Sequence, residues 1–231
     1  MKLAVMQPYF FPYAGYFKLI AEVDKFVFLD DVNYIKSGWI NRNRLFLAGD
    51  VRYITVPLVG ASTNLKINQI SIQSSELWLY KLLDSVRQSY SKAPNFTSTF
   101  DLLRAVLLSG GENNKVSDIA RRSSLEVSER LNFNVSFIKT SAIYENATLK
   151  GSDRVIDICL REKASKYYNL SGGRDLYKED DFAKYNLQLE FVESNLSPYH
   201  QSSREFIPGL SILDVLMFNS FDDARRIIID G

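Results

Sequence analysis

Apolar and polar positions near the start of the chain follow two different periods. Residues 2–6 and 25–29 are short apolar runs of strand length, whereas apolar side chains in 13–21 recur every three or four residues, as on one helix face. Two prolines interrupt residues 7–12 and exclude a regular helix there. Strand, loop, helix and strand in this order predict the opening of a parallel, doubly wound sheet, and therefore an α/β fold.

The rest of the pattern predicts further strands and helices. Residues 44–47 and 51–57 flank a Gly-Asp pair and predict a hairpin. The other predicted strands are 67–72, 136–139, 166–170 and 187–192, and the predicted helices are 75–89, 96–108, 115–131, 152–160, 211–218 and 222–229. Ser75 and Ser152 are the expected N-caps of two of these helices.

The pattern contains no repeat, low-complexity tract or linker that would separate domains. We therefore expect one domain over residues 1–231, with a Rossmann-like, mostly parallel sheet flanked by helices and an added helical portion at about 75–131. Residues 30–43 are polar and contain glycine, so we expect an extended loop there.

The composition of the chain indicates in which compartment the protein lies and which classes of partner it is not expected to bind. The 28 basic and 27 acidic residues nearly balance, whereas nucleic-acid and membrane-surface proteins usually carry a basic excess. No apolar run approaches the ~18 residues of a membrane helix. One cysteine, which we expect in a core, and one histidine exclude an intrachain disulfide and a Cys/His zinc cluster. We expect a cytoplasmic protein without nucleic acid, membrane span or bound metal.

Polar and aromatic side chains gather after the first predicted strand. Gln7, Tyr9, Tyr13 and Tyr16 lie in or beside the loop that leads to the first helix. In a parallel sheet this loop is at the carboxyl ends of the strands, where ligands bind, and the helix N-terminus favours an anion. We assign these four residues to substrate binding. The alternative is an aromatic plug that closes one end of the sheet.

The catalytic candidates are two carboxylates, one lysine and the histidine. Asp30 and Asp31 follow the second strand and could share a proton, orient a nucleophile or hold a divalent cation. Lys36 adds a positive charge to the same segment. His200 has the residue type of a general base near neutral pH, although a loop histidine is often only surface decoration.

A tryptophan, two amides and two arginines continue this polar segment. In an extended chain Arg42 and Arg44 point to one side, whereas Asn41 and Asn43 point to the other. Two arginines on one face suit a phosphate or carboxylate, and Trp39 could stack on the ligand. We assign all five to substrate binding. The alternative is a solvated, salt-bridged surface hairpin.

Two downstream segments complete the predicted site. Lys150 and Arg154 lie at the start of a predicted helix, whose end is already positive, so a bound anion would explain them. Simple capping, with Asp153 complementing the helix dipole, is the alternative. Small residues after strand 166–170 allow a close approach to a ligand, although a plain turn would also use them; they are Ser171, Gly172 and Gly173.

Long stretches of the chain carry a family resemblance. They are QPYFFPYAGYFKLI, VDKFVFLDDVNYIKSGWINRNRL, ITVPL, KGSDRVIDICL, YYNLSGG and FIPGLSILDVLMFNS. Together they resemble the WbqC-like family over nearly the whole chain. That family is found with bacterial O-antigen and surface-polysaccharide genes, and transfer of glycine or a related acyl group to a sugar has been suggested for it. Tyr199 and Gln201 belong to the family pattern and are assigned to substrate binding.

The layout of the N-terminus is also similar to nucleotidylyltransferases and pantothenate synthetases. In those enzymes two histidines around a glycine bind the phosphates of ATP. The motif Pro12-Tyr-Ala-Gly-Tyr16 would place Tyr13 and Tyr16 at those positions. Tyrosine is not a cation at neutral pH, so Lys36 or the two arginines would have to supply the positive charge for adenylyl transfer.

The resemblance and the residues leave three functions open. The leading hypothesis is an enzyme that transfers an acyl or aminoacyl group to an amino sugar carried on a nucleotide. Asp30, Asp31 or His200 would deprotonate the acceptor, and the basic residues named above would hold phosphates. The alternatives are an ATP-dependent ligase or nucleotidyltransferase, and a non-catalytic binding subunit of a glycan assembly complex.

These hypotheses differ in the small molecules that they require. No cofactor is assigned; acyl-coenzyme A, or ATP with Mg²⁺, would act as a co-substrate. The expected partners are a sugar nucleotide and an acyl donor, and a homodimer is left open.

Overall fold

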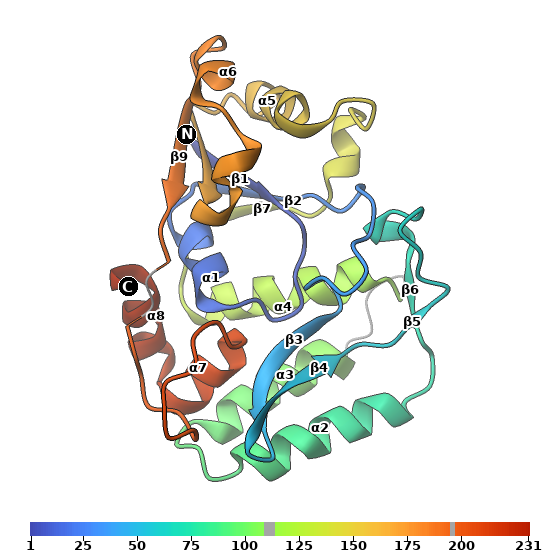
Figure 1. The fold of residues 1–231 in the computed structure, drawn as a ribbon, viewed down its shortest axis with the longest axis vertical. Helices are drawn as coiled ribbons and strands as arrows, with labels where there is room; N and C mark the ends of the chain where they lie inside the picture. Colours follow the sequence, from blue (N-terminus) through green and yellow to red (C-terminus); the bar gives the residue numbers. More distant parts are fainter. Residues whose placement is uncertain (109–113, 195–196) are drawn as a thin grey trace.

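A five-stranded parallel sheet forms the centre of the computed structural model, which describes residues 1–108, 114–194 and 197–231 (Figure 1). Its strands lie in the order β7-β2-β1-β8-β9. They are β1 (Lys2–Met6), β2 (Lys25–Phe28), β7 (Ser136–Ile138), β8 (Lys166–Leu170) and β9 (Gln188–Val192). The chain builds outward from β1 to β7 and then returns to the other side of β1. This is the doubly wound α/β order that the sequence predicts, and such folds bind ligands at the reversal point, here between β1 and β8.

Alternate side chains of the strands enter two separate cores. Leu3 and Val5 of β1 face one side of the sheet, whereas Ala4 faces the other. The Ala4 side is covered by α1 (Ala14–Ala21) and α4 (Val116–Arg130), with α8 (Phe221–Asp230) packed against α1. The opposite side is covered by α5 (Gly151–Arg161) and α6 (Glu179–Ala183) (Figure 1). Because both faces are buried at the centre of the sheet, β1 and β2 are nearly continuous apolar runs in the sequence.

An added helical portion and a hairpin extend the fold below the sheet in Figure 1. The helical portion contains α2 (Leu77–Tyr90) and α3 (Phe96–Leu108), and α3 packs on α4 and on α7 (Ile212–Phe218). The antiparallel pair of β3 (Arg42–Leu47) and β4 (Asp50–Thr55) lies against α2, and β5 (Leu58–Val59) pairs with β6 (Ser71–Ile72). Burial alternates along β3, so Asn43 faces the interior while Arg42 and Arg44 lie on the partly exposed face, as predicted.

Three local predictions are wrong. Residues 67–72 do not form one strand: a 3₁₀ turn, η1 (Ile67–Gln69), precedes β6, because the Ile67 N–H bonds to the Val32 carbonyl of another loop. Helix α5 begins at Gly151 with Lys150 at its N-cap, and Ser152 lies inside the helix. The N-cap of α2 is Glu76 and not Ser75.

The remaining predicted elements lie within two residues of their observed bounds, whereas α6 and β5 have no counterpart among the predicted elements. The strands 2–6 and 166–170 and the helix 96–108 have their predicted bounds. Cys159 is fully buried in the core beneath α5, as expected. Within the described ranges, none of the helices is both long and apolar enough to cross a bilayer.

Candidate functional site

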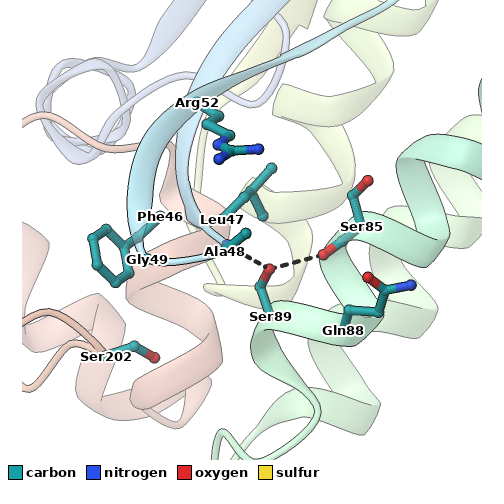
Figure 2. A pocket seen from close by; sticks show the side chains of 9 residues that line it. All are labelled: Phe46, Leu47, Ala48, Gly49, Arg52, Ser85, Gln88, Ser89 and Ser202. Carbon is teal, nitrogen blue, oxygen red and sulfur yellow. Dashed lines mark hydrogen bonds between the residues drawn. The ribbon is translucent and has the colours of Figure 1, made fainter.

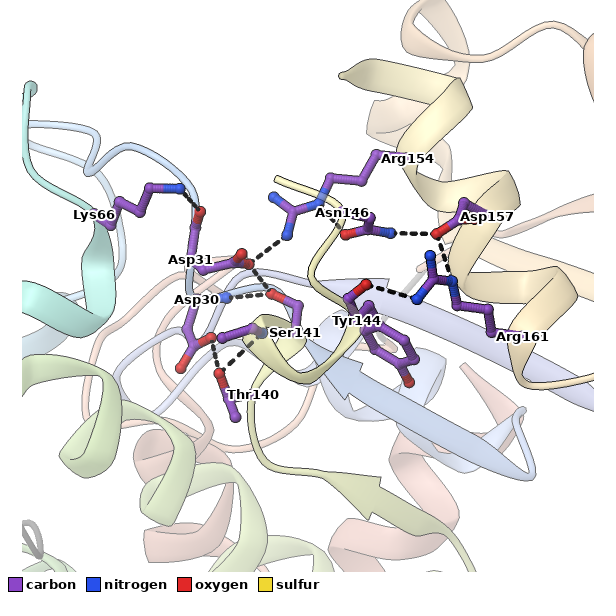
Figure 3. Close-up of polar contacts among 11 residues, drawn as sticks. Asp30, Asp31, Lys66, Thr140, Ser141, Tyr144, Asn146, Arg154, Asp157 and Arg161 are labelled. Atoms are coloured by element: carbon purple, nitrogen blue, oxygen red, sulfur yellow. Dashed lines mark hydrogen bonds and ion pairs between the residues drawn. The ribbon is translucent and has the colours of Figure 1, made fainter. Parts of the chain in front are cut away.

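Two groups of side chains combine residues of the loops that follow the sheet strands with residues of neighbouring elements such as β3 and α5. The first, which we call the Asp31 cluster, consists of Asp30, Asp31, Lys66, Thr140, Ser141, Asn146 and Arg154 (Figure 3). The second, which we call the aromatic pocket, is a cavity of about 190 Å³ lined by Tyr9, Pro12, Tyr13, Trp39, Asn43, Arg44 and Gly209. The loop after β1 contributes to the pocket, and the loops after β2 and β7 contribute to the cluster.

A buried ion pair is the centre of the Asp31 cluster. The Nη2 atom of Arg154 donates to Oδ1 of Asp31 at 2.5 Å, and both side chains are less than one tenth exposed. The Ser141 hydroxyl donates to the same carboxylate oxygen, and Arg154 Nε donates to Oδ1 of Asn146 at 3.0 Å. The Asn146 amide in turn donates to Asp157 at 2.8 Å (Figure 3). Each charge of the cluster centre therefore has a partner within the protein.

The two neighbouring carboxyl groups have pKa values that move in opposite directions. Burial raises the pKa of Asp30, and the Thr140 hydroxyl, which donates to it at 2.6 Å, offsets only part of this effect. Burial also acts on Asp31, but hydrogen bonds from Ser141 and Arg154 outweigh it and lower the pKa of Asp31 overall. Diverging pKa values in adjacent carboxyl groups are typical of acid–base sites. Asp30 is the better proton acceptor of the two.

The aromatic pocket has a guanidinium group against an indole ring. Arg44 lies with its guanidinium carbon 5.6 Å from the centre of the Trp39 ring, and its Nη2 donates to the Gly209 carbonyl at 3.0 Å. Its Nε is buried and has no acceptor among the described residues. Burial raises the pKa of Tyr9 and Tyr13, so both phenols stay protonated at neutral pH. The pocket therefore combines aromatic surfaces with unused hydrogen-bond donors.

Hydrogen bonds from β3 hold the loop after β1 in place. The side-chain amide of Asn43 donates to the carbonyls of Phe10 and Phe11 at 3.1 and 2.7 Å. Ser211 also donates to the Phe11 carbonyl, at 2.7 Å, and the Phe10 N–H donates to the Trp39 carbonyl at 2.9 Å. Phe11 has φ 41°, a conformation that a bulky residue adopts only where its surroundings impose it. The Nδ2 group of Asn43 thus shapes the pocket and has no spare donor for a ligand.

A second cavity adjoins the aromatic pocket at the start of α1. It has a volume of about 300 Å³ and shares Tyr13 and Gly209 with the pocket. Ser194, from the segment after β9, closes on Gly15 so tightly that an added Cβ would lie 2.2 Å from the serine hydroxyl. Glycine at position 15 is therefore required for this contact.

A third cavity lies between the turn of the β3–β4 hairpin and α2, away from the five-stranded sheet (Figures 1 and 2). Its volume of about 560 Å³ exceeds that of the aromatic pocket, and its lining contains Arg52, Ser85, Gln88 and Ser89. The Ser89 hydroxyl accepts from the N–H of Ala48 at 3.2 Å and donates to the backbone, so it fastens the turn to the helix (Figure 2). None of the residues that the sequence assigns to the site lines this cavity.

The two predicted arginines share a face but differ in their partners. Arg42 donates to the carbonyls of Ser37 and Gly38, and its guanidinium carbon is 4.2 Å from the centre of the Tyr53 ring. Arg42 therefore braces its own loop, and only Arg44 lines the aromatic pocket. The paired phosphate fork expected from the sequence is not formed in this arrangement.

Other predicted residues line none of the three cavities. Tyr16 is fully buried and donates to the Gln7 carbonyl at 2.8 Å, so it supports the loop from the core and presents no surface to a ligand. Lys36, Lys150 and Asp153 are exposed. Asn41 is buried, accepts a hydrogen bond from the Tyr34 hydroxyl and donates one to the Val56 carbonyl. These bonds hold the residue that precedes β3 in place.

The predicted turn after β8 is a 3₁₀ helix, η3 (Ser171–Leu176). Gly173 is buried against the side chain of Asn169, where a Cβ would meet the amide nitrogen at 3.0 Å, whereas Gly172 faces open space. A larger residue at position 173 would therefore need the Asn169 side chain to shift by a few tenths of an ångström. The structure places no ligand cavity among those described above against Ser171, Gly172 or Gly173.

The C-terminal residues assigned to the site converge on a carboxylate that the sequence interpretation missed. Tyr199 and Gln201 donate to Oδ1 of Asp214 at 2.7 and 2.9 Å, and Tyr90 donates to Oδ2 at 2.7 Å. Asp214 is fully buried at the first turn of α7. The exposed His200 has its ring centre 5.4 Å from that of Phe218 and contacts neither Asp30 nor Asp31. Tyr199 and Gln201 therefore anchor the segment that carries Gly209.

Sequence signals for the missed residues existed in part. Asp214 is the acid in the otherwise apolar run ILDVLMF, which indicates a buried and bonded carboxylate. Thr140 and Ser141 directly follow β7, at the same edge of the sheet as Asp30. Asn146 has no comparable signal, because its role depends on Arg154 and Asp157.

Comparisons with known proteins cover the elements that form both groups. The model of the WbqC-like protein family matches residues 7–226. A relative, the uncharacterized protein Rv1507c of Mycobacterium tuberculosis (strain ATCC 25618 / H37Rv), is 31% identical over 226 residues, which cover 94% of this chain and 93% of that protein. No solved structure matches the chain. With a family match over nearly its whole length, the chain belongs to the WbqC-like protein family.

Proposed function

We propose that this protein is an enzyme that transfers an acyl or aminoacyl group to an amino sugar carried on a nucleotide, in the synthesis of a bacterial surface polysaccharide. The observation that carries this proposal is the aromatic pocket, which is formed in part by the loop after β1. Doubly wound folds bind nucleotides and related ligands at the carboxyl ends of their strands. The polysaccharide context comes from the resemblance to the WbqC-like family.

The pocket has the chemistry of a carbohydrate site. Tyr9, Tyr13 and Trp39 offer ring faces, on which the apolar C–H face of a sugar can stack, and Arg44 offers a charged donor. Its volume of about 190 Å³ suits one sugar ring and not a whole nucleotide. We therefore assign the pocket to the sugar and expect the nucleotide to extend along the adjoining cavity at the start of α1.

Asp30 is the proposed general base. It lies on the loop directly after β2, and burial gives it a higher pKa than Asp31. A base of this kind removes a proton from the acceptor amine or hydroxyl as that atom bonds to the acyl carbon. The bond from the acyl carbon to the donor breaks in the same transfer, so that coenzyme A leaves as the thiol from acyl-coenzyme A, or AMP leaves from an aminoacyl group activated by ATP. Arg154 keeps Asp31 ionised, so Asp31 orients the loop and holds no proton to exchange.

The test is product formation by the purified protein. Nucleotide-linked amino sugars are incubated with acyl-coenzyme A, and in a second arm with glycine, ATP and Mg²⁺, and products are identified by mass spectrometry. We expect an N-acyl or N-aminoacyl sugar nucleotide in one arm. Absence of product in both arms would contradict the transferase, and pyrophosphate release without amide formation would favour a nucleotidyltransferase instead.

The role of Asp30 is tested by Asp30→Asn. We expect kcat to fall about 10²-fold or more, because the amide cannot accept the proton. Asp101→Asn is the matched control, since Asp101 is exposed on α3. An unchanged kcat for Asp30→Asn would remove Asp30 from the mechanism.

A further inference from the structure

We infer that the aromatic pocket recognises an anion, a phosphate or carboxylate attached to a sugar ring, through Arg44 and the hydroxyls of Tyr9 and Tyr13. The inference deepens the proposed function and rests on it for the sugar body of the ligand. Recognition of the anion rests on the pocket alone.

The free polar groups of the pocket are guanidinium N–H groups, which only donate, and two phenol hydroxyls, which donate and can also accept. Nη2 of Arg44 bonds to the Gly209 carbonyl, whereas Nε and Nη1 have no acceptor in the part of the chain that the structure describes. The hydroxyls of Tyr9 and Tyr13 likewise bond to none of the described residues, and both line the cavity. A ligand that satisfies these groups must bring acceptors.

The acceptors around the pocket are already in use. The carbonyls of Pro12, Trp39 and Gly209 each accept a hydrogen bond from elsewhere in the chain. The side-chain oxygen of Asn43 accepts from the N–H of Arg44 at 2.8 Å. Apart from the two phenol oxygens, the pocket therefore offers more free donors than free acceptors, which disfavours a ligand whose own polar groups are mainly donors.

The charge of the pocket is uncompensated. Its lining contains one guanidinium and, among the described residues, no carboxylate. Arg154, by contrast, is neutralised by Asp31 at 2.5 Å. A partly buried arginine without a carboxylate partner gains most from a phosphate or carboxylate, because two parallel N–H groups can bind two oxygens of the anion.

The aromatic side chains of the pocket determine which group the anion should be attached to. The rings of Tyr9, Tyr13 and Trp39 border a space of about 190 Å³, which leaves room for a ring next to the anion and excludes long acyl chains. An anionic group alone would leave these faces uncovered. A sugar phosphate or a uronic acid fits both parts of the pocket.

The experiment uses the fluorescence of Trp39. The chain has two tryptophans, so Trp78→Phe leaves Trp39 as the sole reporter. Three probes are titrated into the full chain: N-acetylglucosamine 1-phosphate, glucuronic acid and the neutral methyl N-acetylglucosaminide. We expect at least one anionic probe to bind tenfold or more tightly than the neutral one, with binding that weakens as salt is added. The two anions separate phosphate from carboxylate recognition.

Variants locate the anion in the pocket. Arg44→Gln is expected to weaken the anionic probe on the order of 10- to 100-fold, and Tyr9→Phe by a smaller factor, because a charged hydrogen bond is lost in one case and a neutral one in the other. Arg52→Gln is the matched control: it is the same substitution on the same hairpin, at a residue that lines the third cavity. The Tyr9 variant retains its ring and tests the pocket even if Arg44→Gln folds poorly.

The results separate this inference from the proposed function. Anion binding that depends on Arg44, without any transfer activity, would sustain the inference and contradict the transferase. Equal binding of the neutral and anionic probes, binding of no probe, or equal loss in Arg44→Gln and Arg52→Gln would overturn the inference, even where transfer activity is found.

Discussion

The Asp31 cluster and the aromatic pocket each contain an arginine, but only the arginine of the cluster is paired with a carboxylate. In the cluster a buried arginine meets a buried carboxylate, and hydroxyl and amide groups complete its hydrogen bonds. In the pocket an arginine lies against a tryptophan and bonds to one carbonyl. The Arg154–Asp31 pair finds its partners within the protein, whereas the pocket retains guanidinium donors that none of the described residues satisfies.

The difference shows why charge density alone does not locate a binding site. Arg154 and Arg44 both lie within the range that the family model matches, but the charge of Arg154 is used to hold the loops after β2 and β7 together. A buried ion pair whose partners all come from the protein holds these loops in place, and an unpaired donor at a cavity is available for recognition. The predictions below separate these two roles.

The largest effect is expected from Arg154→Met. Removal of the guanidinium leaves the buried Asp31 carboxylate without its partner, so the free energy of unfolding should fall by about 3–5 kcal/mol. Urea denaturation measures this change. Arg226→Met is the control, because its ion pair with Asp223 is mostly exposed and should contribute less than about 1 kcal/mol. Equal losses in the two variants would show that the cluster does not stabilise the fold.

Asp214→Ala should have the next largest effect, and it should affect the pocket. The substitution removes the acceptor of Tyr90, Tyr199 and Gln201, which predicts a loss of about 2–3 kcal/mol. The segment that carries Gly209 should loosen, so the anionic probe should also bind more weakly. Asp222→Ala, at an exposed position of α8, is the control. Unchanged stability and affinity would mean that this network does not hold the pocket wall.

The pH dependence of stability should distinguish Asp31 from an ordinary aspartate. Its pKa in the folded protein lies below the ordinary value of 3.8, because the bonds from Ser141 and Arg154 outweigh the effect of burial. Its stabilising contribution is therefore present above about pH 4 and is lost as the pH falls through the lowered pKa. The stability advantage over Asp31→Asn should shrink over that range in urea titrations. A constant advantage down to pH 2 would contradict the lowered pKa.

The smallest change in stability is expected from Arg44→Gln. The side chain loses a ring contact and one bond to a carbonyl, so the free energy of unfolding should change by no more than about 1 kcal/mol. The same variant should lose anion binding. If Arg44→Gln lowers the free energy of unfolding as much as Arg154→Met does, Arg44 is a structural residue as well, and the distinction between the two arginines is wrong.

Local pattern was sufficient for most of the fold. Strands such as 166–170 and helices such as 96–108 have their predicted bounds, because the spacing of apolar residues that identifies them lies within the element itself. The strand predicted for residues 67–72 was wrong. The N–H groups of Ile67 and Ile72 bond to the carbonyls of Val32 and Asn114, which belong to other segments. Elements whose hydrogen bonds come from distant loops have no local signature.

The sequence by itself determined the α/β class, the family and the residue types that gather after the strands. It indicated that both Arg44 and Arg154 belong near the carboxyl edge. Only the tertiary structure decided that Arg154 meets Asp31 across 123 positions of the chain, that Arg44 meets the Gly209 carbonyl instead of a carboxylate, and that Tyr199 turns to Asp214. The reason is physical: strand order brings these loops together, and the energy of each charge depends on the partner and burial that it finds there.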